Sequence, residues 1–232
     1  MPKPRFKRAG HQKVIELLSG LDAPLLDRAR CYFGGGTRIV LELGEYRESK
    51  DIDFLCSDTE GYRVLRQSIS DKSLGPIARK RLALAREVRA DQYGIRTFLA
   101  SGGTIIKFEI VLEGRIQVAG EDIVAIPVRS LTRRHCFAEK FLANADRGLD
   151  ASMLSRDIVD LAFMMQGWSS SDAAAGLATA KGPYGDSIQR SLAAVLKRMR
   201  EDRSYRNRCI QGLAIEDTRT MAAGLKALEI LL

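Results

Sequence analysis

Cysteine and histidine are scarce in this sequence. Its 232 residues include two histidines, His11 and His135, so few mechanisms that need a histidine base are open to it. The four cysteines form neither a Cys-x-x-Cys pair nor a cluster with histidine: they are Cys31, Cys56, Cys136 and Cys209. This spacing excludes a recognisable zinc site and argues against a disulfide framework, and we therefore expect a reduced, cytoplasmic setting.

Long apolar runs are also missing. The longest, such as IVAIPV and LAFMM, are far shorter than the ~20 residues that span a bilayer. The basic start MPKPRFKRAG is not followed by an apolar segment, so we expect no secretory signal. With 45% hydrophobic and 28% charged residues, the chain has the composition of a folded protein with one large domain or two small ones.

Acidic residues are outnumbered by basic ones. The chain has 29 Asp and Glu against 37 Lys and Arg, a net charge of +8. Such an excess favours polyanionic partners, although an ordinary solvated surface carries it equally well. The basic residues gather in Lys3–Arg8, Arg79–Arg89, Arg129–Arg134 and Arg190–Arg208. The last cluster predicts either a solvated helix or one that binds RNA backbone through Arg190, Lys197, Arg200 and Arg203, with Tyr205 nearby.

The hydrophobic pattern changes near residue 128. Before that point helical and alternating segments are mixed, and after it the spacing is helical. The sequence therefore predicts an α+β domain over residues 1–128 and a helical domain over residues 129–232. In the second domain the pattern predicts helices at 130–146, 154–167, 171–180, 186–200 and 216–231.

The first domain is expected to contain both element types. Helices are predicted at 11–21, 22–32, 37–43 and 59–70, the second with Asp22 as its N-cap. Strands are predicted at 50–56, 93–100, 104–113 and 122–128, while 80–88 is ambiguous. His11 is expected on the surface and Trp168 in a core or between domains.

The segment from Gly34 to Phe54 contains the first candidate functional motif. Gly34–Gly36 precede a short helix, and a glycine turn that opens a helix presents backbone N–H groups where phosphate oxygens can bind. Glycines before helices also serve as plain turn residues. The motif alone leaves both interpretations open.

Two carboxylates follow on the next predicted strand. Asp51 and Asp53 are two residues apart, so their side chains leave the same face of the strand, while Ile52 and Phe54 point to the core. Paired carboxylates suit Mg²⁺ or Mn²⁺, which bind a few carboxylates together with substrate phosphates. An acidic, solvated strand face is the alternative.

The glycine turn, short helix and Asp-x-Asp strand together resemble the nucleotidyltransferase superfamily of DNA polymerase β and the antibiotic nucleotidyltransferases. Within it, residues 31–165 are most similar to the AbiEii toxins of the AbiE phage-defence and related toxin–antitoxin systems. The matching residues are Gly35, Gly36, Thr37, Arg47, Ser49, Asp51 and Asp53. The resemblance implies a mixed sheet with flanking helices and a helical C-terminal domain, and it implies that these residues hold NTP and metal.

A second part of the resemblance lies in the helical domain. CFAEKFLANADRG and SRDIVDLAFM are similar to a Glu-Lys helix and a following Asp-x-x-Asp helix of that family; the counterparts are Glu139, Lys140, Arg147, Asp157 and Asp160. The resemblance implies that Lys140 supplies positive charge to the phosphates and that Asp157 or Asp160 orients it or contacts the nucleotide. An ordinary ion pair between neighbouring helices is the alternative.

The resemblance to the nucleotidyltransferase superfamily also implies a third carboxylate ligand, on a strand antiparallel to the Asp-x-Asp strand. Glu109 is the best candidate, because alternation with Ile106, Phe108 and Ile110 puts it on the polar face of its strand, with Lys107. The alternative is that Glu109 is an exposed strand residue without a ligand role. Two Mg²⁺ ions roughly 3.5–4 Å apart would then be held by Asp51, Asp53 and Glu109.

The expected function is metal-dependent transfer of NMP from an NTP to an acceptor hydroxyl, with RNA, the tRNA 3′ end, as acceptor. By resemblance, the protein is the toxin of a toxin–antitoxin pair and has a cognate antitoxin as partner. The alternatives are a protein-modifying nucleotidyltransferase or kinase of the same fold, and a non-catalytic nucleic-acid-binding protein.

Overall fold

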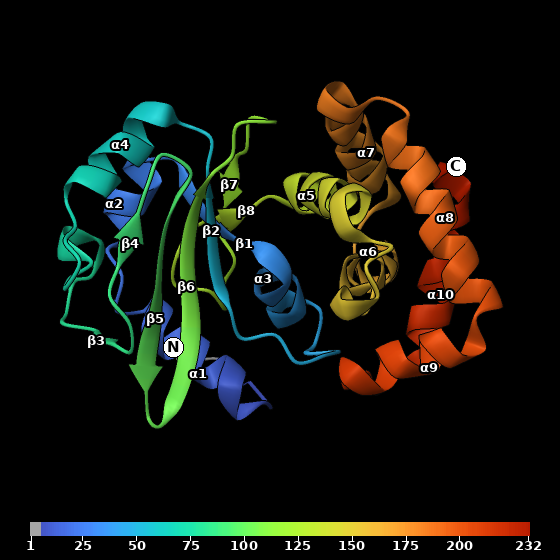
Figure 1. Ribbon diagram of the computed structural model, residues 1–232, viewed down its shortest axis with the longest axis horizontal. Helices are drawn as coiled ribbons and strands as arrows, with labels where there is room; N and C mark the ends of the chain where they lie inside the picture. Colours follow the sequence, from blue (N-terminus) through green and yellow to red (C-terminus); the bar gives the residue numbers. More distant parts are fainter. Residues whose placement is uncertain (1–5) are drawn as a thin grey trace. The chain divides into compact units, whose positions relative to one another are not determined.

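The computed structural model describes residues 6–232 and divides into two compact units (Figure 1). The sheet unit contains the chain up to Glu42 together with Ser49–Thr132, and the helical unit contains Leu43–Glu48 together with Arg133–Leu232. The short segment Leu43–Glu48 therefore belongs to the helical unit, although both of its neighbours in the chain belong to the sheet unit. Of the basic cluster Lys3–Arg8, residues 3–5 lie outside the described part.

The sheet unit is built on a mixed sheet with the strand order β3-β5-β6-β2-β1-β8-β7, and β4 also pairs with β5. The pairs β2–β6 and β1–β8 are parallel, and the other pairs are antiparallel. The strands are β1 (Cys31–Gly34), β2 (Ile52–Cys56), β3 (Ala83–Leu84), β4 (Arg89–Ala90), β5 (Gly94–Ser101), β6 (Thr104–Leu112), β7 (Gly120–Glu121) and β8 (Ser130–Leu131).

Alternation along the long strands decides which face of the sheet is buried. In β6, Ile106, Phe108 and Ile110 are fully buried, and their intervening neighbours are partly exposed. The buried face forms one core with α1 (Ala9–Leu18), α2 (Ala23–Arg28) and α4 (Thr59–Gln67). The predicted α+β class with a mixed sheet and flanking helices is confirmed.

Two local predictions in this unit are wrong. The helix expected over 22–32 begins at the Asp22 cap but ends at Arg28, because Arg30 takes a left-handed φ of 50° and the chain enters β1. No strand forms at 122–128 among the described residues. There the N–H of Ile126 donates to the carbonyl of Ile123 in a turn, and Ile126 and Val128 are buried as irregular chain.

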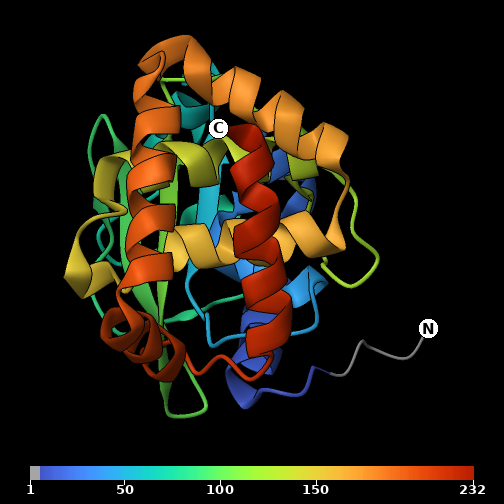
Figure 2. The ribbon, with the colours of Figure 1, turned by 90° about the vertical axis from the view of Figure 1, so that its right-hand side faces the viewer.

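The helical unit contains α5 (Arg133–Arg147), α6 (Arg156–Gly167), α7 (Ser170–Tyr184), α8 (Ser187–Glu201), α9 (Arg203–Gly212) and α10 (Thr218–Leu228). α5 packs against α7 and α6 against α10, which crosses it in Figure 2. Gly224 permits the second crossing, because a Cβ there would meet the Ala162 carbonyl at 2.0 Å. Trp168 is buried in this unit, edge-on to Phe137.

The short helix α9 is missing from the sequence-based prediction. Its N-cap Asp202 accepts a hydrogen bond from the N–H of Tyr205, but its composition is polar and its apolar spacing is weak. None of the helices within residues 6–232 is both long enough and apolar enough to cross a membrane.

Candidate functional site

The glycine turn lies directly against the second aspartate of the Asp-x-Asp pair. β1 and β2 are antiparallel, and their register pairs Gly34 with Asp53. The next residue, Gly35, opens α3 (Gly35–Glu42) with a φ of +67°. A Cβ on Gly35 would lie 2.5 Å from Oδ2 of Asp53. Only glycine combines this backbone conformation with this approach, so the turn forms a cradle around the carboxylate.

The two aspartates occupy the exposed side of the strand, as the alternation predicts. Asp51 lies just before β2 and Asp53 within it; both are partly exposed, whereas Ile52 and Phe54 are fully buried in the core. Two carboxylates and a glycine cradle form an oxygen-rich corner that suits a hard divalent cation together with phosphate oxygens. These residues therefore fit the metal that the sequence predicts.

Thr37 and Ser49 are brought together beside this corner. The Thr37 hydroxyl, on the first turn of α3, lies 3.0 Å from the Ser49 hydroxyl. The backbone N–H of Ser49 donates to Nε2 of His11 at 3.3 Å. His11 is fully buried, so the prediction that it lies on the surface is wrong. Its position on the apolar side of α1, next to Val14 and Ile15, was the available signal.

Glu109 lies next to Asp53 on the neighbouring strand, but its carboxylate is already paired. The register of β2 and β6 places the two residues side by side, and the strands are parallel, not antiparallel as expected. The Glu109 carboxylate accepts from Nε of Arg96 at 2.6 Å and also pairs with Lys107. Burial acts to raise the pKa of Glu109, but Lys107 and Arg96 outweigh it and lower the pKa.

The structure does not gather three ligands at this corner. Within residues 6–232, no group of three or more His, Cys, Asp or Glu side chains is arranged to hold a metal ion. Asp51 and Asp53 are thus the fitting pair. A ligand role for Glu109 requires its carboxylate to turn away from two cations.

The remaining predicted residues form a buried ion network in the helical unit. Nζ of Lys140, on α5, lies 2.8 Å from Asp157 and 2.6 Å from Asp160, one turn apart on α6. The Arg47 guanidinium binds both oxygens of Asp160, at 2.7 and 2.8 Å. Arg147 binds Asp157 at 2.8 Å. Three cations here face two carboxylates.

Electrostatics keep both aspartates of the network ionised. Burial raises the pKa of Asp157, but attraction to Lys140 and hydrogen bonds from Arg147 bring it far below its usual value. For Asp160, attraction to Arg47 and Lys140 likewise outweighs burial and lowers the pKa. Removing the charge of Asp160 would leave the buried Arg47 without its carboxylate partner.

Sequence reasoning missed two buried polar residues near these motifs. The Tyr46 hydroxyl donates to Asp160 at 2.6 Å, and its ring stacks on Phe163 at 3.9 Å. Arg38, on α3, is fully buried and pairs with Glu42 and, at 2.9 Å, with Glu121. The four-residue spacing of Arg38 and Glu42 was the only signal in the sequence.

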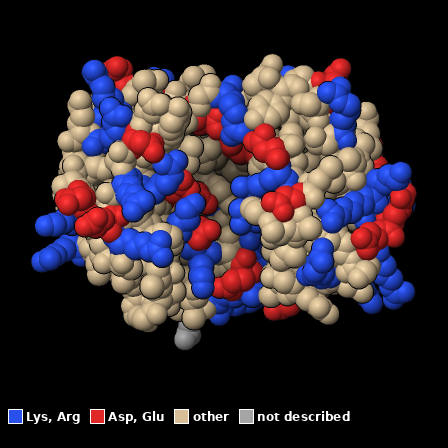
Figure 3. Space-filling view, in the orientation of Figure 1, with Lys and Arg blue, Asp and Glu red and all other residues tan. Residues whose placement is uncertain are grey.

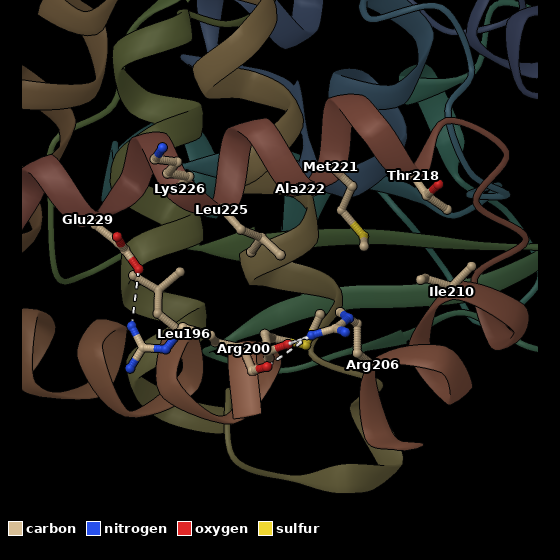
Figure 4. A pocket seen from close by; sticks show the side chains of 11 residues that line it. Leu196, Arg200, Arg206, Ile210, Thr218, Met221, Ala222, Leu225, Lys226 and Glu229 are labelled. Atoms are coloured by element: carbon tan, nitrogen blue, oxygen red, sulfur yellow. Dashed lines mark hydrogen bonds and ion pairs between the residues drawn. The ribbon is translucent and has the colours of Figure 1, made fainter. Parts of the chain in front are cut away.

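An apolar cavity in the helical unit is not lined by the residues of the ion network. It has a volume of about 480 Å³ and is formed by α8, α9 and α10, with Met199, Met221 and Leu225 on its walls (Figure 4). Arg200, a candidate for RNA binding, lines it, whereas none of the residues predicted to hold NTP or metal does. On the face shown in Figure 3, Lys and Arg are interspersed with Asp and Glu over both units.

Comparisons with known proteins agree with the motifs. The family model for the nucleotidyl transferase AbiEii toxin of type IV toxin–antitoxin systems matches residues 16–223. Curated protein sequences gave no match. The JHP933 protein of Helicobacter pylori has a similar fold, with a TM-score of 0.56 at 15% identity over 98% of this chain and 93% of that one.

A second H. pylori structure, solved as a candidate nucleotidyltransferase, has a TM-score of 0.54 at 16% identity over 95% of this chain and 92% of that chain. At these identities the two structures show a shared fold. The family match extends beyond both ends of the resemblance read from the motifs and takes in the glycine turn, the Asp-x-Asp pair and the Lys140 network. The chain belongs to the AbiEii family of nucleotidyl transferase toxins.

Proposed function

We propose that this toxin transfers NMP from an NTP to a hydroxyl group of RNA, the 3′ end of tRNA, with the help of Mg²⁺ or Mn²⁺. The single observation that carries the proposal is the contact between the Gly35 turn and the Asp53 carboxylate. It sets backbone N–H groups for phosphate beside a carboxylate for metal, and a nucleoside triphosphate with its divalent cation needs both.

Each residue of the sheet unit has a role in this proposal. Gly35, Gly36 and Thr37 hold phosphate oxygens at the start of α3, and Ser49 fixes Thr37 through their shared hydrogen bond. Asp51 and Asp53 would hold the metal, which neutralises phosphate charge and favours ionisation of the acceptor hydroxyl. Glu109 is proposed as a third ligand.

The reaction balances without a histidine. The acceptor oxygen bonds to the α-phosphorus as the bond to pyrophosphate breaks; pyrophosphate leaves and the hydroxyl proton passes to water. The protein contributes positioning and charge, which are the main contributions to phosphoryl and nucleotidyl transfer.

The helical unit enters the proposal mainly through positioning. Asp160 fixes Arg47, and Arg47 precedes Ser49 by two residues, so the network anchors one end of the segment that leads to Asp51. Asp157 and Asp160 both orient Lys140. Lys140 is proposed, by resemblance to the family, to supply positive charge to the phosphates.

The test compares the wild type with Asp51→Asn, Asp53→Asn and the exposed Asp71→Asn as a matched control. Each protein is incubated with Mg²⁺, one α-labelled NTP at a time, and total cellular RNA. We expect label on RNA with wild type and Asp71→Asn, and a loss of at least 10²-fold with the other two variants, in line with removal of a group that stabilises the transition state.

Two other outcomes would replace the proposal. Label on protein instead of RNA identifies a protein-modifying enzyme of the same fold. No label in any form, together with RNA binding that the Asp51 and Asp53 variants retain, identifies a non-catalytic nucleic-acid-binding protein.

A further inference from the structure

A row of residues crosses the sheet from the candidate site to the sheet edge. The strand register pairs Asp53 with Glu109, Glu109 with Arg96, and Arg96 with Arg89. Directly paired residues share a face of the sheet. With strands about 4.8 Å apart, β5 and β4 lie about 10 and 14 Å from the strand of Asp53. The exposed face that carries Asp53 thus continues into a basic edge.

This edge concentrates positive charge in a way that the fold does not need. Arg89 and Arg96 are directly opposed on antiparallel strands, and like charges in that position destabilise the pair. The Arg86 guanidinium lies over the Phe98 ring, 4.6 Å from its centre, a contact that orients the arginine without neutralising it. Together with Glu87 and Thr97, these residues line a hollow of about 480 Å³, in which three arginines outnumber one carboxylate.

A second basic hollow lies close by along the chain. It has a volume of about 420 Å³, and its lining includes Lys72, Arg79, Lys80 and Arg81. Leu84, in β3, also lines this second hollow. β3 pairs with β5, and Arg96 and Phe98 of β5 line the first hollow. Both hollows therefore border the edge formed by β3, β4 and β5. They open on different faces of the sheet, because Leu84 is paired with the buried Leu99, whereas Arg96 and Phe98 lie on the opposite face.

Most cations of this edge have no acidic partner in the structure. Arg79 lies 3.4 Å from Asp22, and Arg96 is paired with Glu109 and Asp91. Among residues 6–232, by contrast, no carboxylate pairs with the side chains of Lys72, Lys80, Arg81, Arg86 and Arg89. Clustered and uncompensated cations of this kind attract a polyanion.

We propose that this edge, defined by Lys72, Lys80, Arg81, Arg86 and Arg89, binds the phosphate backbone of the RNA acceptor. The inference rests on the proposed function for the identity of the acceptor. Two groups of cations at one sheet edge match a ligand with repeated phosphates, whereas the single triphosphate of an NTP is accounted for by the glycine turn. The row from Arg89 to Asp53 connects the bound backbone to the site of transfer.

Three arginines of α8 and α9 are held by groups of the helical unit itself. Arg200 pairs with Glu201 and Glu229, and Arg206 donates to the backbone carbonyls of Met199 and Arg200. Arg198 donates to the Leu149 carbonyl. Of the four cations for which the sequence predicted RNA binding, Arg200 is thus already paired, while among residues 6–232 no ion pair involves Arg190, Lys197 or Arg203.

The test measures RNA binding and transfer by the full chain. Fluorescently labelled total tRNA is titrated with wild type, Arg86→Gln/Arg89→Gln and Lys80→Gln/Arg81→Gln over a range of salt concentrations. The matched control is Arg219→Gln/Lys226→Gln, which removes two exposed cations from the helical unit. NTP binding and Tm are measured for all four proteins to show that fold and nucleotide site are intact.

We expect each edge variant to lose about tenfold in tRNA affinity and its salt slope to fall by about two, one for each phosphate contact removed. NTP binding should stay within about twofold of wild type, and the control should bind tRNA as wild type does. Equal tRNA affinity in the edge variants and wild type, or an equal loss in the control, overturns the inference.

Failure of the inference and failure of the proposed function give different results. If wild type labels RNA and the edge variants label it equally well, the function stands and the edge is not the RNA site. If the edge variants lose tRNA binding but wild type transfers no nucleotide, the RNA site stands and the proposed reaction falls. Label on protein with no tRNA binding overturns both.

Discussion

Gly35 and Asp53 are in such close contact that any side chain on the first would displace the carboxylate of the second. The ideal Cβ position at Gly35 lies 2.5 Å from Oδ2 and 3.0 Å from Cβ of Asp53. The glycine is therefore required twice, for its φ of +67° and for the space beside it. One residue couples the backbone of the phosphate turn to the position of the candidate metal ligand.

Gly35→Ala should consequently damage both stability and activity. We expect a loss of about 1–3 kcal/mol in the free energy of unfolding from backbone strain and a displaced Asp53, measured by urea denaturation, and loss of NTP binding. Gly44→Ala is the control: its φ is +80°, but no atom lies within 4 Å of its Cβ position. It should show strain alone and keep NTP binding, and equal NTP binding in the two variants would contradict the prediction.

Asp160→Asn should be among the most destabilising single changes in the helical unit. It leaves Arg47 and Lys140 buried without a shared counter-ion, and such losses cost about 3–5 kcal/mol. Asp157→Asn should cost less, because its partner Arg147 is 38% exposed and can turn to water. Chemical denaturation of both variants measures the two losses in the free energy of unfolding. A larger loss in Asp157→Asn than in Asp160→Asn would contradict the prediction.

Acid should destabilise the protein through the same two aspartates. Their pKa values in the folded state lie below the ordinary value of 3.8, so the unfolded chain takes up protons first as the pH falls. The stability that the two ionised aspartates contribute is fully present well above pH 3.8. It is lost progressively as the pH falls from about 5 to about 1. Tm measured against pH should fall steeply there, and less steeply in Asp157→Asn/Asp160→Asn. If Tm falls equally steeply with pH in wild type and in the double variant, other groups determine the acid sensitivity.

His11→Phe should weaken NTP binding without contact to the nucleotide. The change leaves the Ser49 N–H without its acceptor, at a cost of about 1–3 kcal/mol, and loosens the residue that holds Thr37. We expect a several-fold rise in KM for NTP and a small change in kcat. His11→Gln, which offers a new acceptor, should recover part of the loss; if both variants bind NTP as wild type does, His11 has no positioning role.

The elements that the sequence predicted well are those with a strong local pattern. Alternation along 104–113 and 93–100, with the turn at Gly102 and Gly103, gave the β5–β6 hairpin, and Asp51 to Phe54 gave the orientation of β2. β1 was missed because four consecutive buried residues, Cys31–Gly34, carry no alternation. A run buried on both faces looks the same in a helix and in a strand.

The motifs of the candidate site could be predicted from the sequence, but the side-chain contacts of its residues could not. Gly35, Asp53, Lys140 and the aspartates of α6 were found from spacing and resemblance. The contacts of Asp160 with Tyr46 and Arg47 span 114 and 113 residues, and no local pattern reports a contact of that range. The parallel pairing of β2 and β6, which sets Glu109 beside Asp53, likewise depends on long-range contacts and not on the local sequence.

The segment Leu43–Glu48 has a consequence for the order in which the protein is made. On the ribosome, Arg47 emerges long before Asp160, the residue that neutralises it. Until α6 has been synthesised, Arg47 has no Asp160 to bind. The segment Leu43–Glu48, which connects α3 to Ser49, then lacks this contact with the helical unit. The ion pair that anchors Leu43–Glu48 in the helical unit therefore forms only after the chain has been synthesised as far as Asp160.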